Sequence, residues 1–314
     1  MSMHKPRIAL AALALALLAA CSSQGPGDQA GPGKDQGGQG NQAVGLALST
    51  QNNPFFVALK KGAEDAAREA GVQLIVVDAQ DDSAKQIANV EDLIQKHVGA
   101  LLLNPTDSAA LVGAVEEANR AGIPVITLDR AVDGGKVLSH IASDNRAGGA
   151  TAARFLKTAL ADHGNVIELE GVPGTSAARE RGEGFETELA NSSLKLIARQ
   201  PANFDRAQAM SVTENLLQAH PDVQGLFAQN DEMALGALRA LDGAGKHDVV
   251  VVGFDGTPDA LDAIKQGKLA ATVAQQPELM GQLGVQTAAK ALHGQPVDAK
   301  VVVPLKLVTR EAAH

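Results

Sequence analysis

The sequence predicts an α/β fold of two doubly wound, parallel-sheet lobes of the Rossmann-like kind. From residue 44 onward, short and nearly continuous runs of Val, Ile and Leu alternate with helical stretches, as buried parallel strands alternate with crossover helices. The alternation restarts midway, and a chain of 314 residues is long enough to bury two hydrophobic cores. The composition, 45% hydrophobic and 20% charged, is that of an ordinary soluble α/β protein.

The first half of the alternation predicts a βαβαβ arrangement. Its helices have clear start signals, since Pro54 follows Asn53 and the next two helices open at Ser83 and Asp107, and a glycine closes each of them. The expected helices cover residues 53–71, 83–99 and 107–122. The expected strands cover residues 44–49, 72–78, 100–104, 123–129 and 137–143.

The second half repeats the pattern. Helices are expected over residues 145–163, after Gly174, over residues 205–220 and from Asp231, and strands over residues 165–171, 194–200, 225–230 and 249–255. After residue 270 the runs LAATVAQ and AKVVVPLKLV flank one more helix. These runs could cross between the two halves, which would make each domain discontinuous.

Polar side chains follow many of the expected strands. In open α/β sheets ligands bind at the carboxyl ends of the strands. Asn offers a donor and an acceptor, Asp accepts two hydroxyl protons and Arg supplies a fork of donors, so this set suits a small, neutral, polyhydroxylated ligand. Each residue alone also has an ordinary explanation as a helix cap, turn or loop residue. The set comprises Asn53, Asn104, Asp129, Arg130, Asn230, Asp231 and Asp255.

Aromatic residues are scarce, with seven Phe, no Trp and no Tyr, yet Phe55 and Phe56 stand side by side at the start of a helix. Periodicity alone predicts that they are the first core residues of that helix. Adjacent helix positions point about 100° apart, however, so both cannot face one core in the same way. Because aromatic faces cover the C–H faces of sugars well, the pair could instead form one wall of a binding cleft.

The N-terminus predicts export. A basic start precedes an apolar run from Ile8 to Ala20 that is too short for a comfortable membrane span, as in a signal peptide over residues 1–20. Residues 18–21, LAAC, resemble the bacterial lipobox, which implies a lipid on Cys21 and attachment to a membrane; an ordinary signal peptide with an incidental cysteine is the alternative. Residues 21–43 are rich in Gly, Gln and Pro and predict a flexible tether of roughly 25 Å.

Several function classes are disfavoured by composition and motifs. The net charge of −9 argues against nucleic acid as a partner. No HExxH motif, phosphate loop or Cys/His cluster occurs, so we expect no metal and no cofactor. A repressor would need a helix-turn-helix ahead of residue 44, where the chain has a signal and a Gly-rich segment.

Several long strings resemble the periplasmic D-ribose-binding family of bacterial ABC import systems, within the pentose- and hexose-binding group that shares its fold with LacI-type repressor cores. The resemblance runs from about Val44 to Val308. It implies a periplasmic binding protein type I fold, in which three hinge crossovers join two lobes around a sugar-binding cleft. The strings include STQNNPFFVALKKGAEDAA, IPVITLDR, GTSAARERGEGF, QPANFDR, FAQNDEMALGALRAL and VVGFDGTPD.

The resemblance also implies particular residues and lobe boundaries. The lobes would comprise residues 44–143 with 276–304, and residues 144–275 with 305–314. The implied ligand contacts are Asn53, Phe55, Phe56, Asn104, Asp129 and Arg130 from the first lobe, Arg181, Phe204, Asn230 and Asp255 from the second, and Gln275 at a hinge strand.

The mechanism that the resemblance implies is binding with hinge closure. Charged side chains buried without partners cost several kcal/mol per ion, so sugar hydroxyls that pair with them favour the closed form. The implied ligand is D-ribose; a receptor for allose, galactose or a furanosyl signal of the autoinducer-2 type is the alternative. The implied partners of this monomer are an ABC permease in the inner membrane and, as a further candidate, a chemoreceptor.

An enzyme is the main alternative class. Asp129 and Asp255 could form a glycosidase pair, which needs one acid with a raised pKa. Arg130 follows Asp129 directly, and the resemblance places Arg181 in the same cleft. Since nearby cations favour ionised carboxylates, we expect a binding protein and no catalytic residues.

Overall fold

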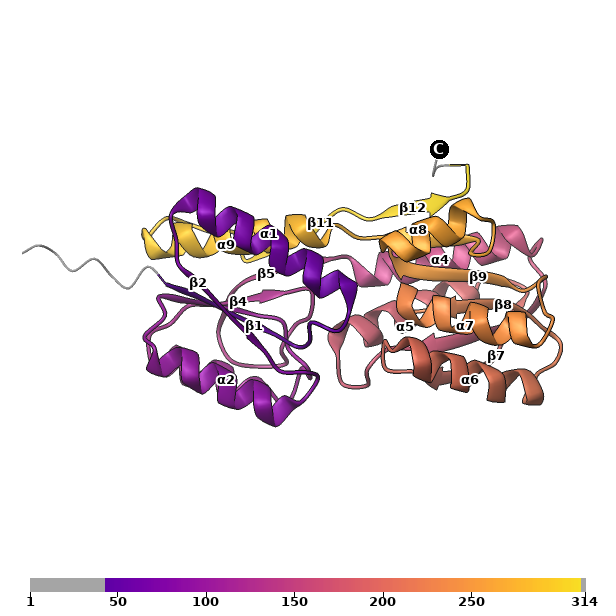
Figure 1. The fold of residues 1–314 in the computed structure, drawn as a ribbon, viewed down its shortest axis with the longest axis horizontal. Helices are drawn as coiled ribbons and strands as arrows, with labels where there is room; N and C mark the ends of the chain where they lie inside the picture. The colour runs from indigo at the N-terminus through magenta and orange to yellow at the C-terminus, as the bar shows by residue number, and fades with distance from the viewer. Residues whose placement is uncertain (1–42, 312–314) are drawn as a thin grey trace, which may run out of the picture. The chain divides into compact units, whose positions relative to one another are not determined.

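Two six-stranded sheets form the framework of residues 43–311, the part of the chain that the computed structural model describes (Figure 1). Helices cover both faces of each sheet, and each sheet with its helices is a lobe. This arrangement confirms the predicted fold class of two doubly wound α/β lobes.

The first lobe contains a fully parallel sheet of strand order β11-β5-β4-β3-β1-β2. Helices α1 and α9 share a core with one face, and α2 and α3 share a core with the other. Strand boundaries are β1 Val44–Leu48, β2 Leu74–Asp78, β3 Ala100–Leu103, β4 Val125–Leu128, β5 Val137–Ser143 and β11 Lys300–Val303. Helix boundaries are α1 Pro54–Ala70, α2 Ser83–Gln95, α3 Val112–Arg120 and α9 Pro277–Leu292.

The second lobe contains a sheet of order β12-β10-β9-β8-β6-β7, parallel except that β12 runs antiparallel to β10. Helices α4 and α5 pack on one face, and α6, α7 and α8 on the other. Strand boundaries are β6 Gly164–Glu170, β7 Leu194–Pro201, β8 Val223–Ala228, β9 Val250–Asp255, β10 Ala271–Ala274 and β12 Lys306–Thr309. Helix boundaries are α4 Asn145–Ala159, α5 Ser176–Leu189, α6 Arg206–Ala219, α7 Asp231–Gly243 and α8 Pro258–Lys265.

Within residues 43–311 the chain passes between the two lobes three times, after β5, after β10 and after β11. The last passage splits the run AKVVVPLKLV, because β11 ends at Val303 in the first sheet and β12 begins at Lys306 in the second. Pro304 stands at the break, where it has no N–H to offer a strand ladder. The C-terminal runs therefore supply edge strands to both sheets.

Three local features differ from the expectations. Helix α3 begins at Val112 rather than near Asp107, because the Asp107 carboxylate accepts hydrogen bonds from the amides of Ala109 and Ala110 and holds a turn there. Helix α8 was not expected, although Pro258 at its first position is a start signal. Ala43, assigned to the tether, is buried in the first lobe and accepts a hydrogen bond from the Gly99 amide.

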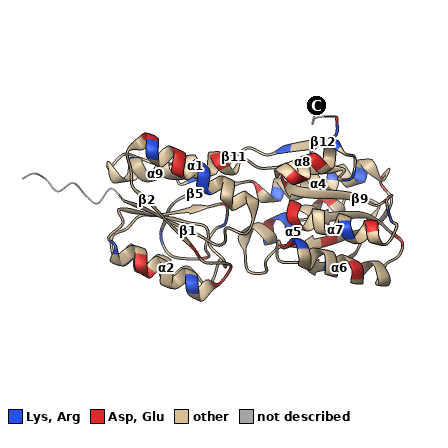
Figure 2. Cartoon of the chain, in the orientation of Figure 1, with Lys and Arg blue, Asp and Glu red and all other residues tan. Residues whose placement is uncertain are grey.

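Basic and acidic residues are interspersed along the helices of both lobes (Figure 2). On α1, for example, Asp65 pairs with Lys61 at 2.7 Å and with Arg68 at 2.8 Å. Among residues 43–311, no helix has both the length and the apolar character needed to cross a bilayer. Residues 1–42, including Cys21, lie outside the described part of the chain, so the signal peptide, the lipidation and most of the tether remain predictions.

Candidate functional site

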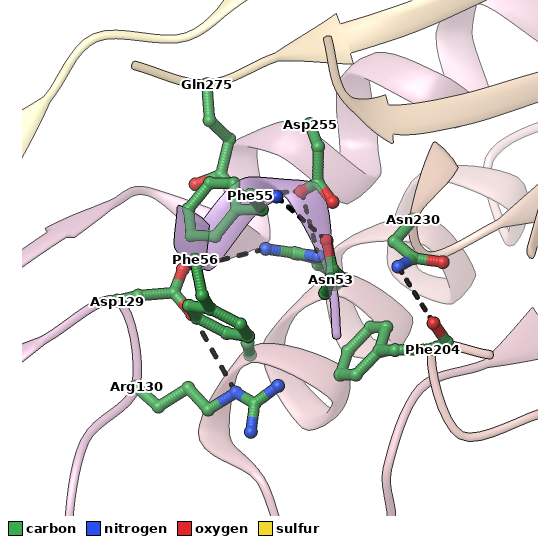
Figure 3. Close-up of a pocket in the computed structure, with 11 residues that line it drawn as sticks. Asn53, Phe55, Phe56, Asp129, Arg130, Phe204, Asn230, Asp255 and Gln275 are labelled. Carbon is green, nitrogen blue, oxygen red and sulfur yellow. Dashed lines mark hydrogen bonds and ion pairs between the residues drawn. The ribbon is translucent and has the colours of Figure 1, made fainter. Parts of the chain in front are cut away.

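A polar cleft lies between the two lobes, at the carboxyl ends of their strands (Figure 3). About 240 Å³ of space lies between its side chains, part of it open to solvent, so the site is a small one. The structure brings together every predicted contact except Asn104, and adds Ala177, a small residue that carries no polar signal in the sequence. The lining residues are Asn53, Phe55, Phe56, Asp129, Arg130, Ala177, Arg181, Phe204, Asn230, Asp255 and Gln275.

Two cleft asparagines are held in place because they cap helices. The Asn53 side-chain oxygen accepts a hydrogen bond from the Phe55 amide at 2.9 Å and caps α1, as its position before Pro54 predicts. Asn230 caps α7 in the same way, through the Met233 amide at 2.9 Å. Its side-chain nitrogen donates to the carbonyl oxygen of Phe204 at 3.3 Å (Figure 3). These capping bonds fix the positions of the Asn53 and Asn230 side chains in the cleft.

Phe55 and Phe56 are both core residues and cleft residues. Their rings meet edge to face, with centroids 5.2 Å apart and an interplanar angle of 88°. Both pack into the core of the first lobe, and both line the cleft. The perpendicular arrangement follows from their adjacent positions on the helix. Phe55 and Phe56 are therefore part of the helix core and part of the cleft wall at the same time.

Phe204 faces the cleft from the second lobe. Its ring lies against Gly171, where an added Cβ would come 2.0 Å from the ring, so the position requires glycine. Three cleft residues, Phe204, Asp129 and Asp255, have positive φ values of 58°, 63° and 117°. Non-glycine residues rarely adopt such backbone conformations, and they cluster at functional sites.

The two cleft arginines lie against aromatic rings. The Arg130 guanidinium carbon is 5.1 Å from the ring centre of Phe56 and 5.3 Å from that of Phe204. The Arg181 guanidinium carbon lies 3.9 Å from the ring centre of Phe254. At these distances a buried cation is attracted by the ring face, so the rings orient both guanidinium groups.

Arg130 and Arg181 balance two buried carboxylates. Arg130 Nε lies 3.7 Å from Asp129 Oδ2, and Arg181 lies 4.0 Å from Asp129 and 3.7 Å from Asp255. All four side chains are 4% exposed. Two cations and two anions leave the cleft close to neutral, which suits an uncharged ligand.

Burial raises the pKa of Asp129 and of Asp255, although Arg181 lowers both. For Asp255 the rise is large, and the negative charge of Asp231 adds to it. The nearby cations therefore act in the direction that the sequence predicts, and burial of the two carboxylates acts against them.

Several buried polar atoms of the cleft have no hydrogen-bond partner among the described residues. They are Asp129 Oδ1, Arg130 Nε and Gln275 Oε1. The side-chain nitrogen of Gln275, in contrast, donates to Asp255 at 2.9 Å. Since a buried polar group without a partner costs about 1–3 kcal/mol, these atoms mark where a hydroxylated ligand would be stabilised. Among residues 43–311, no cluster of three or more His, Cys, Asp or Glu could hold a metal ion.

Asn104 lies behind the cleft rather than in it. It is fully buried, accepts a hydrogen bond from the Ser49 hydroxyl at 2.7 Å and donates to the carbonyl of Leu128 at 3.0 Å. Its side-chain nitrogen is 3.5 Å from Asp129 Oδ2. Asn104 therefore supports the backbone and carboxylate of a cleft residue, while Asp129 itself fills the position that faces the ligand space.

Two α/β lobes that enclose a buried, nearly neutral cleft define a solute-binding protein of the two-lobed type. The chain belongs to the periplasmic binding protein family, whose domain model matches residues 44–296. The ribose import binding protein RbsB of Bacillus subtilis (strain 168) is 52% identical over 98% of this chain and 100% of its own length. RbsB of Escherichia coli (strain K12) is 56% identical over 85% of this chain and 90% of its own.

Solved structures support the same assignment. A periplasmic solute-binding protein of an ABC transporter from Actinobacillus succinogenes 130z, with bound D-allose, superposes with a TM-score of 0.82. It is 34% identical to this chain and covers 86% of it and 98% of its own length.

Proposed function

We propose that the chain binds D-ribose with high affinity outside the cytoplasm, closes its lobes around the sugar and delivers it to an ABC permease. The observation that carries this proposal is the cleft, in which side chains from both lobes present buried polar atoms and aromatic faces to one small space. Similarity to the two RbsB proteins supports ribose, since both are import binding proteins for that sugar by name.

The proposed mechanism uses the sugar as the missing hydrogen-bond partner. A hydroxyl can donate to Asp129 Oδ1 or Gln275 Oε1 and accept from Arg130 Nε, and each of these atoms lacks a hydrogen-bond partner within the described residues. Because these atoms belong to both sides of the hinge, pairing them favours the closed arrangement. A sugar that misplaces one hydroxyl leaves one of these groups unpaired, at a cost of about 1–3 kcal/mol.

We propose as ligand contacts the predicted residues that line the cleft. These are Asn53, Phe55, Phe56, Asp129, Arg130, Arg181, Phe204, Asn230, Asp255 and Gln275. Asn104 is assigned a supporting role behind Asp129. The proposed lobes are residues 44–143 with 276–304 and residues 144–275 with 305–314, which agrees with the strand membership of the two sheets.

A related sugar is the second candidate ligand. The D-allose-binding periplasmic protein of Escherichia coli (strain K12) is 36% identical over 77% of this chain and 81% of its own length. Its identity is lower than that of the RbsB proteins, which favours ribose.

For the N-terminal segment we propose a signal peptide over residues 1–20, a lipid on Cys21 and a tether that ends before the buried Ala43. This would hold a monomeric, exported receptor close to its permease at the membrane surface. We propose that the protein acts by binding alone and not as an enzyme, because the named relatives are import binding proteins.

The test is a calorimetric titration of residues 41–314 with D-ribose, allose, arabinose, xylose and galactose. We expect tight, one-to-one binding of ribose and weaker binding of the other sugars. Binding of allose or galactose in the absence of a response to ribose would replace ribose as the ligand. Mass spectrometry of the full-length protein from membranes checks for the lipid on Cys21.

A further inference from the structure

Asp231 is a buried acid at the edge of the cleft that does not line it. It belongs to the polar set at the strand ends, directly after Asn230, and it is the first residue of α7. Its side chain is 0% exposed and is absent from the cleft lining. A fully buried carboxylate is costly unless it is well hydrogen-bonded, so its contacts indicate what it does.

The Asp231 carboxylate joins two further segments of the second lobe. Oδ2 accepts hydrogen bonds from the backbone amide of Thr257 at 2.7 Å and from its hydroxyl at 3.2 Å. Oδ1 accepts from the hydroxyl of Thr272 at 2.7 Å. Thr257 follows β9, and Thr272 lies in β10, the strand that leads to a crossover between the lobes. Asp231 therefore ties the start of α7 to the loop after β9 and to a hinge strand.

Gly253 makes room for this carboxylate. It pairs with Thr272 between β9 and β10, and an added Cβ on it would come 2.3 Å from Asp231 Oδ1. A side chain at residue 253 would displace Asp231 from both threonines. The absence of a side chain at Gly253 therefore leaves the space that the Asp231 carboxylate occupies beside β9 and β10.

Each of the three joined segments carries one proposed ligand contact. Asn230 directly precedes Asp231, Asp255 lies two residues before Thr257, and Gln275 lies three residues after Thr272. Gln275 and Asp255 also lie together in the cleft, where the Gln275 side-chain nitrogen donates to Asp255 Oδ1 at 2.9 Å (Figure 3). The Gln275 backbone amide donates to the Asp255 carbonyl at 2.8 Å. We infer that Asp231 is a positioning residue that holds Asn230, Asp255 and Gln275 in register for the ligand. The inference rests on the proposed function.

Asp231 also contributes its charge. The charged groups that act on Asp255 include Arg181 from α5, Asp129 and Arg130 from the first lobe, and Asp231 from α7. The negative charge of Asp231 raises the pKa of Asp255, and burial raises the pKa of Asp231 itself to about 6. An amide at residue 231 would remove this charge and keep an acceptor for the Thr257 amide, so Asp255 would stay ionised to lower pH.

The test measures ribose affinity of the full chain by calorimetry between pH 5 and pH 8. We expect Thr272→Val, which removes a single hydroxyl, to weaken binding about 5- to 10-fold, and Asp231→Ala to weaken it at least 30-fold. Asp231→Asn should stay within about threefold of wild type at pH 8 and lose affinity at a lower pH than wild type. The matched control is Thr213→Val, since the hydroxyl of this buried threonine donates to Ala209 within α6 and should leave affinity unchanged.

A second measurement separates this inference from the proposed function. Backbone hydrogen exchange of the ligand-free protein should speed up at residues 255–257 and 272–275 in Thr272→Val, and stay unchanged there in Thr213→Val. Wild-type affinity in Thr272→Val, together with unchanged exchange, would overturn the positioning role even if ribose binds. A wild-type chain that binds no sugar while Thr272→Val still loosens these segments would contradict the proposed ligand and support the structural coupling.

Discussion

Arg179 and Asp133 connect the two lobes directly, with Arg179 Nη2 3.1 Å from Asp133 Oδ1. Arg179 lies on α5 of the second lobe, and Asp133 lies between β4 and β5 of the first. Beside this pair, the Ala131 amide donates to the Ser176 hydroxyl at 2.8 Å. These contacts involve no ligand, so they add to closure of the cleft whichever sugar is bound.

We predict that Asp133→Asn speeds ligand release by up to about fivefold at low ionic strength, because an exposed ion pair contributes at most about 1 kcal/mol. The difference should fade at high salt, where exposed charges are screened. Stopped-flow release of ribose at two salt concentrations measures this. Glu188→Gln is the control, since it breaks an exposed ion pair with Arg154 inside the second lobe. Equal release rates for Asp133→Asn and wild type at low salt would contradict the prediction.

We predict that Phe204→Ala weakens ribose binding about 10- to 100-fold, because it removes the aromatic face that the second lobe presents to the cleft. The ring is only partly buried and packs at the margin of the core, so stability should change less than affinity. Phe155→Ala removes a comparably placed ring from another core of the same lobe and should leave affinity unchanged. Calorimetry and thermal unfolding of both variants check this, and similar affinities for the two would refute it.

The two cleft arginines should respond differently to substitution. Arg181 donates to Asn145 at 2.9 Å and to the Gln229 carbonyl at 2.7 Å, and it lies near Asp129 and Asp255. We therefore predict that Arg181→Ala abolishes binding and also destabilises the fold by about 3–5 kcal/mol, since it leaves buried charges without a partner.

Within residues 43–311, Arg130 makes one hydrogen bond, to the Pro105 carbonyl at 3.3 Å. Arg130→Ala should reduce affinity at least 100-fold with a smaller loss of stability than Arg181→Ala. Denaturant unfolding and calorimetry of both variants make the comparison. A larger loss of stability for Arg130→Ala would show that the roles of the two arginines are reversed.

Glu168 on β6 should make stability depend on pH. It is fully buried, one oxygen has no partner within the described residues, and burial raises its pKa to about 7. Since the folded-state pKa lies above the unfolded one, the neutral acid stabilises the fold below about pH 4.5, and this contribution is lost as pH rises through 7. Glu168→Gln keeps an acceptor for the Gln229 amide, which donates to Glu168 at 2.8 Å.

We therefore predict that Glu168→Gln has a larger free energy of unfolding than wild type at pH 8, by on the order of 3 kcal/mol at most, and unfolds at a higher temperature. The difference should disappear near pH 4. Calorimetric unfolding across this range measures it. Glu214→Gln, at an exposed position of α6, is the control. An equal difference at both pH values would show that Glu168 does not titrate in this range.

The sequence predicted most elements because the local signals agree with the fold. Asn53 before Pro54 indicates a cap, and the structure shows that cap on α1. Nearly continuous runs of Val, Ile and Leu indicate buried strands, and β1, β3 and β4 are buried throughout. Helix α8 was missed because it has only eight residues, although Pro258 marks its start.

The cleft was harder to predict from residue types alone. Asn104 follows a strand as the cleft residues do, but its amide is used by Ser49 and Leu128 from neighbouring strand ends. The titration of Asp129 depends on how completely closure buries it, which no spacing of Arg and Asp reveals. Phe204 was predicted as a site residue from the family resemblance alone. It lies in a loop with a φ of 58°, so no helical or strand periodicity indicates its role.

The split between β11 and β12 has a consequence for how the chain is made. Both sheets receive an edge strand from residues 300–309, one on each side of Pro304. A polypeptide synthesised from its N-terminus therefore leaves the edge of both sheets unfinished until residues 300–309 have emerged. The two lobes then complete their sheets with one short stretch of chain rather than one after the other.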